Sequence, residues 1–298
     1  MNNVTNPSIE DLFLYKMVYY IKLTGFTISI FGVFLNTLSF LTARRLKYQT
    51  SSTALIQCQA IWEGISSIHD GIVVLGSDVY QFNLLNINDF LCKILKLHGW
   101  GSTVAAFYQM VVLSLDRVVA IRYPLWFREY SKPHFAYIIS LLISLLSYGA
   151  CSPNLFKFKI ENSRCVMKAS ITFTYWYTMV FMTTIGVIVP FFVVGLSNVY
   201  FVYSLKTRKK SFSNAERRLT VMLLTNSIVF TIFISSISLL NSLTFTYKPI
   251  TVADRAVLYF ITYSVYFLTI LNSSVNFIFY FVSGPMFRSA FLNTRFVG

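Results

Sequence analysis

The chain has 298 residues, of which 55% are hydrophobic and only 12% are charged, and its mean hydropathy is +0.61. A soluble domain carries about 25% charged residues, and a single core cannot hide this much apolar surface from water, which excludes a water-soluble protein. The excess of 25 Lys and Arg over 11 Asp and Glu is typical of nucleic-acid-binding proteins, but the positions of these charges argue against nucleic acid as a partner.

Seven stretches of the chain are long and apolar enough to cross a membrane, which takes roughly 20 residues of helix. Six contain long windows without charge, and Glu63 and Asp70 interrupt the other. An ionisable side chain at membrane depth usually faces the interior of a helix bundle. We therefore predict an all-α membrane protein, a seven-transmembrane helix bundle over residues 18–283, with spans at about 18–43, 52–77, 90–121, 134–154, 172–205, 216–243 and 255–282.

The distribution of Lys and Arg predicts the orientation of the bundle. One side collects 15 of the 25 in short loops, namely Arg44, Arg45, Lys47, Arg117, Arg122, Arg128, Lys132, Lys206, Arg208, Lys209, Lys210, Arg217, Arg218, Arg288 and Arg295. Because basic residues are enriched on the cytoplasmic side, we expect a plasma-membrane protein with residues 1–17 outside and 284–298 inside. Residues 1–17 lack the pattern of a cleavable signal peptide, and Asn3 begins an N-glycosylation sequence.

The four cysteines fall into two groups by position. Cys58 and Cys151 lie within spans, where a cysteine is usually a small apolar core residue. Cys92 lies at the outer start of the third span, and Cys165 lies in the outer loop between the fourth and the fifth. Both face an oxidising compartment, where disulfides form. A Cys92–Cys165 bond would tie that loop over the mouth of the bundle.

Several short motifs occur in a fixed order along the spans. They are Gly32-Val33-Phe34-Leu35-Asn36, Leu115-Asp116-Arg117-Val118-Val119-Ala120-Ile121-Arg122-Tyr123-Pro124-Leu125, Pro190, and Asn272-Ser273-Ser274-Val275-Asn276-Phe277-Ile278-Phe279-Tyr280. Together, over roughly residues 25–295, they resemble the rhodopsin-like (class A) G-protein-coupled receptors, including the Asp-Arg-Tyr box and the Asn-Pro-x-x-Tyr motif of that family.

The chain departs from the family pattern in several places. Val118 replaces the Tyr of the Asp-Arg-Tyr box, Phe277 replaces the Pro of the last motif, and Glu63 stands where an Asp is normal. The sixth span, 219–243, has neither the Trp nor the Pro of the family's Cys-Trp-x-Pro switch. These losses suggest a divergent invertebrate-type receptor, either an orphan or a chemosensory or peptide receptor. Its sixth helix would switch between states without the Trp and Pro that the family uses.

The resemblance assigns coupling and switching to residues near the cytoplasmic side: Asp116, Arg117, Pro124, Glu216 and Tyr280. Asp116 and Arg117 neutralise each other while paired, and a separated Arg117 can bind a partner protein. The alternative is an ordinary snorkelling pair at a helix end. The downstream Pro124 favours the interpretation of Asp116 and Arg117 as a switch over that of a snorkelling pair.

The resemblance also brings five polar residues together in mid-bundle: Asn36, Glu63, Asn272, Ser273 and Asn276. Lipid penalises such groups when they are unpaired. One carboxylate with amides and a hydroxyl can hold water, Na⁺ or a proton. Ala106 occupies the place of a serine that the family uses here, so a structural water cluster stays open beside a sodium site.

Helical periodicity places ligand-pocket candidates on the outer halves of the spans. Counting back from Arg117 at about 100° per residue, Thr103 and Gly99 face inward, with Lys96 near the rim. The remaining candidates lie on the second, fifth and seventh spans: Asp70, Tyr175, Phe181, Thr262, Tyr266 and Thr269. At the aromatic positions, packing is the alternative role.

The resemblance argues against two ligand classes. Gly99 occupies the place where amine receptors have an Asp, which disfavours a monoamine. Residues 256–287 contain no Lys, so no retinal Schiff base can form there. The ligand classes that remain are a peptide and an environmental small molecule.

Two further features follow from the resemblance. Cys92 lies 25 residues before Arg117, the spacing that the family uses for its disulfide, so we predict the Cys92–Cys165 bond. Over 285–294 we predict a short amphipathic helix on the membrane surface, with Phe287, Phe291 and Leu292 on one side and Arg288 on another.

No catalytic constellation, phosphate-binding loop or internal repeat occurs, and the histidines have no metal-ligand spacing. We therefore predict neither an enzyme nor a resident metal or cofactor apart from Na⁺. The implied partners are an extracellular ligand, a heterotrimeric G protein, arrestin and membrane lipid. The alternative function is a seven-span ligand-gated channel or secondary transporter, but the inverted repeats and broken spans typical of transporters are missing from the sequence.

Overall fold

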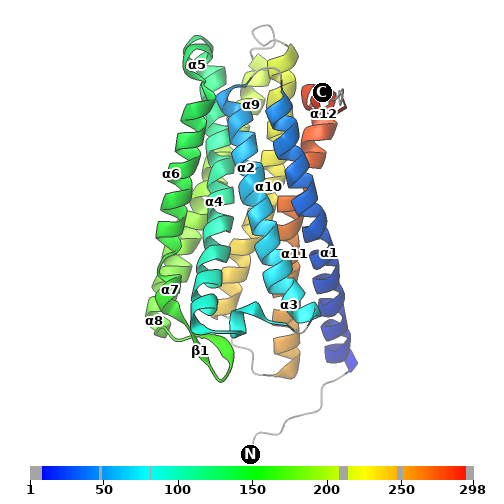
Figure 1. Cartoon of the computed structure of the whole chain (residues 1–298), viewed down its shortest axis with the longest axis vertical. Helices are drawn as coiled ribbons and strands as arrows, with labels where there is room; N and C mark the ends of the chain where they lie inside the picture. The colour runs from blue at the N-terminus through cyan, green and yellow to red at the C-terminus, as the bar shows by residue number, and fades with distance from the viewer. Residues whose placement is uncertain (1–8, 47–48, 81, 208–213, 247–250, 293–298) are drawn as a thin grey trace, which may run out of the picture.

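The computed structural model describes residues 9–46, 49–80, 82–207, 214–246 and 251–292. In this part of the chain, seven helical rods run along the long axis of the molecule (Figure 1). In chain order they are α1 (Ile9–Arg45), α2 (Ser51–Ser67) continued by the π-helix η1 (Ile68–Leu75) and α3 (Gly76–Val79), α4 (Asp89–Arg122), α6 (Pro133–Cys151) followed by α7 (Asn154–Lys157), α8 (Ile171–Thr174) continued by the π-helices η3 (Tyr175–Met182) and η4 (Thr184–Ile188) and by α9 (Val189–Thr207), α10 (Asn214–Thr246), and α11 (Val252–Ser283).

Short elements close the two ends of the bundle. They are the 3₁₀-helix η2 (Leu84–Asn86), α5 (Pro124–Tyr130), the strands β1 (Phe158–Glu161) and β2 (Arg164–Met167), and α12 (Pro285–Leu292). The strands form an antiparallel hairpin at one end, and α5 and α12 lie at the other (Figure 1). We call these the hairpin end and the α12 end. Asn162 and Ser163 form the two-residue turn of the hairpin, and both have positive φ, as the turn types that match strand twist require.

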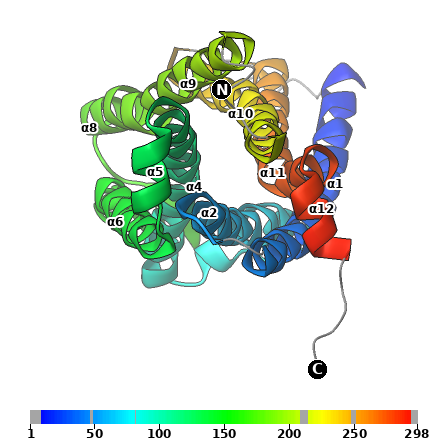
Figure 2. The same ribbon diagram turned by 90° about the horizontal axis from the view of Figure 1, so that it is seen from above.

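The rods pack around a common centre (Figure 2). α1 contacts α2 and α11, and α4 contacts α2, α6 and α9. α10 completes the bundle between α9 and α11, and α12 lies against α1 and α11. α4 therefore has neighbours on several sides and runs from the hairpin end to the α12 end (Figure 1).

The rods have the apolar surface of membrane helices. Among the described residues, five helices are long and apolar enough to cross a membrane: Phe13–Arg45, Asp89–Arg122, Pro133–Lys157, Ile171–Ser204 and Val252–Val282. A shorter apolar helix lies at Leu223–Ile237 in α10, and the second rod carries Glu63 and Asp70 within its length.

α6 shows the same pattern on a single helix. Its outward side chains Leu141, Leu142, Leu145 and Leu146 are 54–73% exposed. Its opposite face is buried and consists mostly of small residues: Ala136, Ser140, Ser144, Ser147 and Cys151. Small residues at the contact and large apolar ones outside are typical of helices that pack in lipid. The predicted all-α membrane bundle is confirmed.

The fifth rod is not a uniform α-helix, because two π-helical segments precede α9. Pro190 lies in the first turn of α9 and has no backbone N–H, so the regular hydrogen-bond ladder cannot run through this turn. π turns add residues to a helix without adding turns, and they turn the side chains that precede them to a different face. The whole rod still runs continuously from Ile171 to Thr207.

Local sequence sets the ends of the helices. Thr50 and Thr53 form a capping box at the start of α2, and Thr251 and Asp254 form one at the start of α11. Asn88 caps α4 by accepting a hydrogen bond from the Leu91 N–H at 2.8 Å. α5, α6 and α12 each begin at a proline, whose missing N–H is not needed in a first helical turn.

α12 is the short amphipathic helix that the sequence predicts. Phe287 is 2% exposed, and its ring lies 5.8 Å from that of Phe277 and 5.6 Å from that of Tyr280. Phe291 also packs on Phe277, at 5.4 Å. Leu292, expected on the same side, is 61% exposed. Five residues carry a helix about 140° beyond one full turn, which takes Leu292 away from the face of Phe287.

We expect Phe287→Ala to destabilise the protein by about 3–5 kcal/mol, because it removes a fully buried ring between α11 and α12. Met286→Ala is the matched control, since Met286 is the neighbouring residue and is 48% exposed. Thermal unfolding of the two purified variants measures the difference. Equal loss of stability in both would contradict the packing of α12.

Candidate functional site

At the α12 end, a buried ion pair lies at the end of α4. The Arg117 guanidinium donates a hydrogen bond to the Asp116 carboxylate at 2.9 Å, and the two side chains are 7% and 10% exposed. Ser51 and Ser52, at the start of α2, donate their hydroxyl hydrogens to the two carboxylate oxygens of Asp116. Arg117 also lies 5.5 Å from the Phe127 ring of α5. The pair is therefore held by two other helices.

The two serines are site residues that sequence reasoning missed. The only local signal is that they follow the helix cap Thr50 directly. Ser131, just after α5, extends the group, because its hydroxyl accepts a hydrogen bond from the Ser51 N–H at 3.2 Å. Pro124, a predicted switch residue, is the exposed first residue of α5. Glu216 is on α10, but its side chain lies outside the described residues.

A second polar cluster lies in mid-bundle between α1, α2, α10 and α11. Glu63 is 4% exposed and accepts hydrogen bonds from Gln59 Nε2 at 2.8 Å and from Asn276 Nδ2. The Tyr280 hydroxyl donates to Gln59 Oε1 at 3.1 Å and accepts from Asn226 Nδ2 at 3.0 Å. Tyr280, predicted as a switch residue, thus connects α11 with α2 and α10.

The other mid-bundle candidates bind α1 to α11. Asn36 donates to the Ser273 carbonyl at 2.7 Å, and Asn272 is buried beside Ser273 on α11. The helices approach closely here, since a Cβ added at Gly32 would lie 2.2 Å from the Ser274 hydroxyl. The five residues predicted to converge therefore lie in one buried region, but Asn36 meets the α11 backbone rather than the carboxylate.

This geometry bears on the predicted sodium site. Hard cations take oxygen ligands, whereas the carboxylate of Glu63 accepts amide N–H groups on both oxygens. The side chains present satisfy the carboxylate by themselves and do not form an oxygen cage. The residues do not fit a sodium ion in this arrangement, and sodium binding stays a prediction.

A partly open cavity of about 260 Å³ lies toward the hairpin end between α4, the second rod, the fifth rod, α10 and α11. Six of the predicted pocket residues line it: Asp70, Gly99, Thr103, Thr262, Tyr266 and Thr269. Its other walls are mostly apolar, with Val104, Phe107, Met182, Val187, Ile237 and Leu240. The cavity has the mostly apolar lining with a few polar groups of a small-molecule site, and its volume lies just below the range of about 300–1,000 Å³ that such sites have.

One wall of this cavity depends on a glycine. His69 and Asp70 are both 7% exposed, and the His69 ring contacts the Leu95 carbonyl through Nε2 at 2.9 Å and the Asp70 carboxylate through Nδ1 at 3.2 Å. A Cβ at Gly99 would come within 2.2 Å of the imidazole. Only glycine at this position of α4 leaves room for the ring, which the sequence alone did not indicate.

The predicted positions on the fifth rod do not belong to this cavity. Tyr175 and Phe181 are 47% and 44% exposed and do not line it. The prediction extended the α-helical period of 3.6 residues through this rod, but both residues lie in the π-helix η3, where that period does not hold. The residues of the rod that do line the cavity are Met182, Gly186 and Val187.

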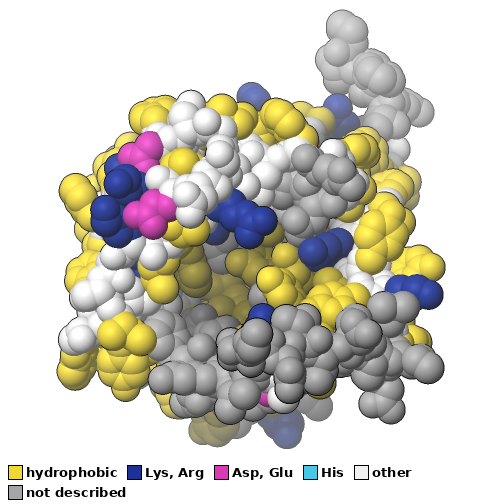
Figure 3. Space-filling model, turned by 90° about the horizontal axis from the view of Figure 1, so that it is seen from below, with side chains coloured by type: hydrophobic (Ala, Val, Ile, Leu, Met, Phe, Trp, Pro, Cys, Tyr) yellow, Lys and Arg dark blue, Asp and Glu magenta, His cyan; other side chains and the backbone are white. Residues whose placement is uncertain are grey.

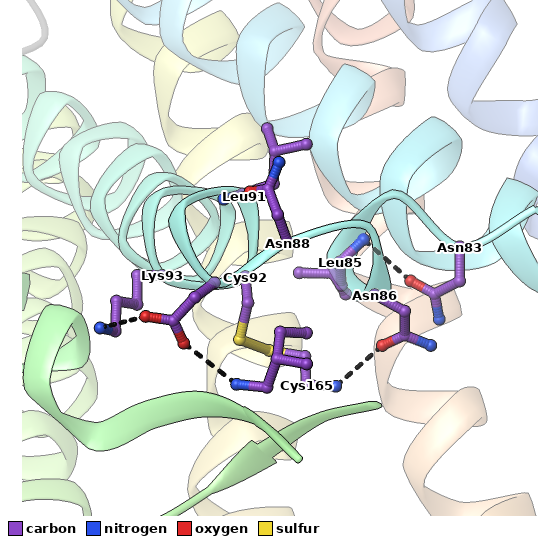
Figure 4. The surroundings of a disulfide bond; sticks show 10 residues. Asn83, Leu85, Asn86, Asn88, Leu91, Cys92, Lys93 and Cys165 are labelled. Atoms are coloured by element: carbon purple, nitrogen blue, oxygen red, sulfur yellow. Dashed lines mark hydrogen bonds and ion pairs between the residues drawn. A yellow bond between two sulfur atoms is a disulfide. The ribbon is translucent and has the colours of Figure 1, made fainter. Parts of the chain in front are cut away.

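The hairpin is attached to the first turn of α4 by a disulfide and by hydrogen bonds (Figure 4). Cys92 and Cys165 form a disulfide, as predicted. The Cys165 N–H donates to the side chain of Asn86 at 2.9 Å, and the Ile160 N–H donates to the side chain of Asp89 at 3.1 Å. These bonds fix the hairpin across one side of the hairpin end.

The fold and these sites define a multi-pass membrane protein with a partly open cavity toward one end and a buried ion pair at the other. Residues 71–280 match the model of the 7 transmembrane receptor (rhodopsin family). The match covers most of the chain, and the protein therefore belongs to the rhodopsin-like G-protein-coupled receptors, as its motifs predict. No curated protein matches it.

We expect Cys92→Ser, Cys165→Ser and the double variant to lose the same stability, about 4 kcal/mol, because one cross-link separated by 73 residues is lost in each. Thermal unfolding measures the loss, and reduction of the unaltered protein should reproduce it. Mass spectrometry that found both thiols free in surface-expressed protein would contradict the bond.

We expect Gly99→Ala to destabilise the protein by about 1–3 kcal/mol, because the new methyl group must displace the His69 ring. Gly149→Ala is the control: no atom lies within 4 Å of a Cβ at Gly149 of α6, so alanine there should be neutral or stabilising. Thermal unfolding compares the two. Similar values for both variants would show that His69 does not pack as described.

Proposed function

We propose that this receptor lies in the plasma membrane, binds an extracellular ligand in the cavity near the hairpin end, and activates a heterotrimeric G protein at the α12 end. The observation that carries the proposal is that one helix, α4, lines the cavity with Gly99 and Thr103 and ends in the Asp116–Arg117 pair. A ligand in the cavity and a protein bound at the pair therefore touch the same rod.

Two independent features support an orientation with the hairpin end outside. The short loops at the α12 end carry most of the Lys and Arg residues, which favour the cytoplasm. The Cys92–Cys165 disulfide lies at the other end, and disulfides persist in oxidising compartments. Glycosylation of Asn3 would follow from this orientation, but Asn3 lies outside the described residues and the modification stays a prediction.

The resting state is held by the surroundings of Asp116. This carboxylate is neutralised by Arg117 of α4 and accepts hydrogen bonds from Ser51 and Ser52 of α2, so both helices hold it in place. A ligand can shift the balance between the resting and the active state only by binding one of them more tightly. When the group around Asp116 opens, Arg117 becomes available to a segment of the G protein, and arrestin would bind at the same end.

A movement of α10 would connect the ligand cavity to the group around Asp116. Ile237 and Leu240 of α10 line the cavity, and Asn226, about three turns away on the same helix, donates to Tyr280. α10 contains no proline, so it has no hinge of that kind and would tilt as a whole. Such a tilt would break the bond between Asn226 and Tyr280, which lies next to the mid-bundle cluster.

We expect Asp116→Asn to raise ligand-independent signalling about tenfold, because the neutral amide loses the charge that holds Arg117. Ser52→Ala should have the same direction and a smaller size, since it removes one donor. Glu129→Gln is the control, because Glu129 is an exposed acid of α5 at the same end. A G-protein reporter in cells, corrected for surface expression, measures all three.

Arg117→Ala should abolish G-protein activation while the receptor still reaches the cell surface and binds ligand, because the group that meets the partner is gone. Surface labelling and the same reporter measure the two properties separately. If Arg117→Ala signals normally, the role proposed for Arg117 in coupling is wrong, and other residues must meet the G protein; if neither the unaltered receptor nor the variant activates a G protein, the channel or transporter alternative becomes the better explanation.

A further inference from the structure

The ligand cavity continues outward into a second one. This outer cavity, of about 520 Å³, is lined by Asn83, Arg255, Tyr259 and Tyr263 among others, and it shares Val74, Lys96, Thr262 and Tyr266 with the inner cavity. Figure 3 shows the hairpin end: it is hollowed near its centre, and several Lys and Arg side chains lie at the described part of the rim, among hydrophobic ones. Lys96 stands where the two cavities meet.

The acid of the inner cavity already has partners within the bundle. The Asp70 carboxylate lies 3.2 Å from Nδ1 of the His69 ring and accepts a hydrogen bond from the Ser66 hydroxyl at 3.4 Å. Both residues of the His69–Asp70 pair are 7% exposed, so the acid is held by protein groups.

Lys96 and Arg255 line the cavities and Lys157 lies nearby, and none of the three forms an ion pair with a carboxylate among the described residues. Lys96 is half-buried, and its ammonium lies 5.2 Å from the Phe158 ring. Lys157 approaches the same ring to 5.5 Å and donates to the Thr178 hydroxyl, so two ammonium groups flank one ring.

A second lysine of α4, Lys93, does have an acid partner. Lys93, three residues before Lys96, lies 2.5 Å from the carboxylate of Asp89 and lines neither cavity. The same helix therefore carries one lysine with an acid partner outside the cavities and one without an acid partner where the cavities meet. An anion placed beside Lys96 would gain a charge-assisted hydrogen bond that Lys93 cannot offer.

We infer that the natural ligand is a small carboxylic acid whose carboxylate binds Lys96, with Arg255 on the outer side, and whose apolar body fills the inner cavity. This rests on the proposed function, because it assumes that the cavity is the ligand site. The apolar walls, including Phe107 and Ile237, accept a hydrocarbon or aryl body, and hydroxyls such as that of Tyr266 can bind a polar substituent. An amine of the same shape would meet Lys96 and find no uncompensated acid.

The test uses the purified full-length receptor in lipid nanodiscs, without G protein. Alkyl and aryl carboxylic acids of graded length, octanoate among them, are compared with the amine and the alcohol of the same skeleton, octylamine and octanol in that case. Binding is measured by the rise in unfolding temperature as a function of concentration. We expect some acids to stabilise the receptor saturably and their amines and alcohols to do so at least tenfold more weakly.

Variants of α4 assign the effect to Lys96. Lys96→Gln should weaken the acids about tenfold or more, as expected for the loss of one charged hydrogen bond, and Lys96→Glu should shift the preference to the matched amines. Arg255→Gln, at an exposed residue, should weaken the acids less. Lys93→Gln is the matched control and should bind the acids as the unaltered receptor does.

Three results would overturn the inference: no acid of the series binding saturably, amines binding as well as acids, or Lys96→Gln leaving acid binding unchanged. Its failure can be told from that of the proposed function, because no G protein is present in the assay. Acids that bind through Lys96 but never activate a G protein in cells would leave this inference standing and count against the coupling.

Discussion

A carboxyl group in the middle of an apolar bundle has to find its hydrogen-bond donors within the bundle, because lipid offers none. Glu63 finds them in Gln59 and Asn276, and Gln59 in turn accepts from Tyr280. Tyr280 then reaches α10 through Asn226. These bonds form one connected chain, so satisfying one buried carboxyl group links the positions of α2, α10 and α11.

The same constraint separates the two functional ends. Where the bundle satisfies its own polar groups, the helices approach closely, as at Gly32 against Ser274 and along the serine face of α6. Toward the hairpin end, Gly99 leaves room on one wall for an imidazole and a cavity. At the α12 end, Asp116 and Arg117 lie at the end of their helix, where serines of α2 can reach them. The polar cluster in between ties together helices that take part in both sites.

The parts of this architecture that were predictable are those encoded over short stretches of sequence. Charge-free windows indicate membrane helices because a single charge in lipid is costly, and paired motifs such as Asp116-Arg117 keep their spacing along one helix. Contacts between distant segments left no such signal: Ser51 and Ser52 look like ordinary helix-start residues. Helical periodicity failed at Tyr175 and Phe181, because the π turns of η3 turn these side chains outward.

The charges at the hairpin end also bear on the function. Lys and Arg are enriched on the cytoplasmic side, so basic residues at the hairpin end work against the orientation proposed for the receptor. Such a residue is easier to explain when an acidic group lies beside it. Lys93 and Lys168 have Asp89 and Glu161 close by, at 2.5 and 3.9 Å. Lys96 lies between two cavities, its ammonium against an aromatic ring that a second ammonium also faces. Two like charges around one ring repel each other, and an anionic ligand entering the cavity would relieve that repulsion while it binds. The receptor would then be more stable with its ligand than without it for an electrostatic reason, in addition to the apolar contacts that any body of the right size would make.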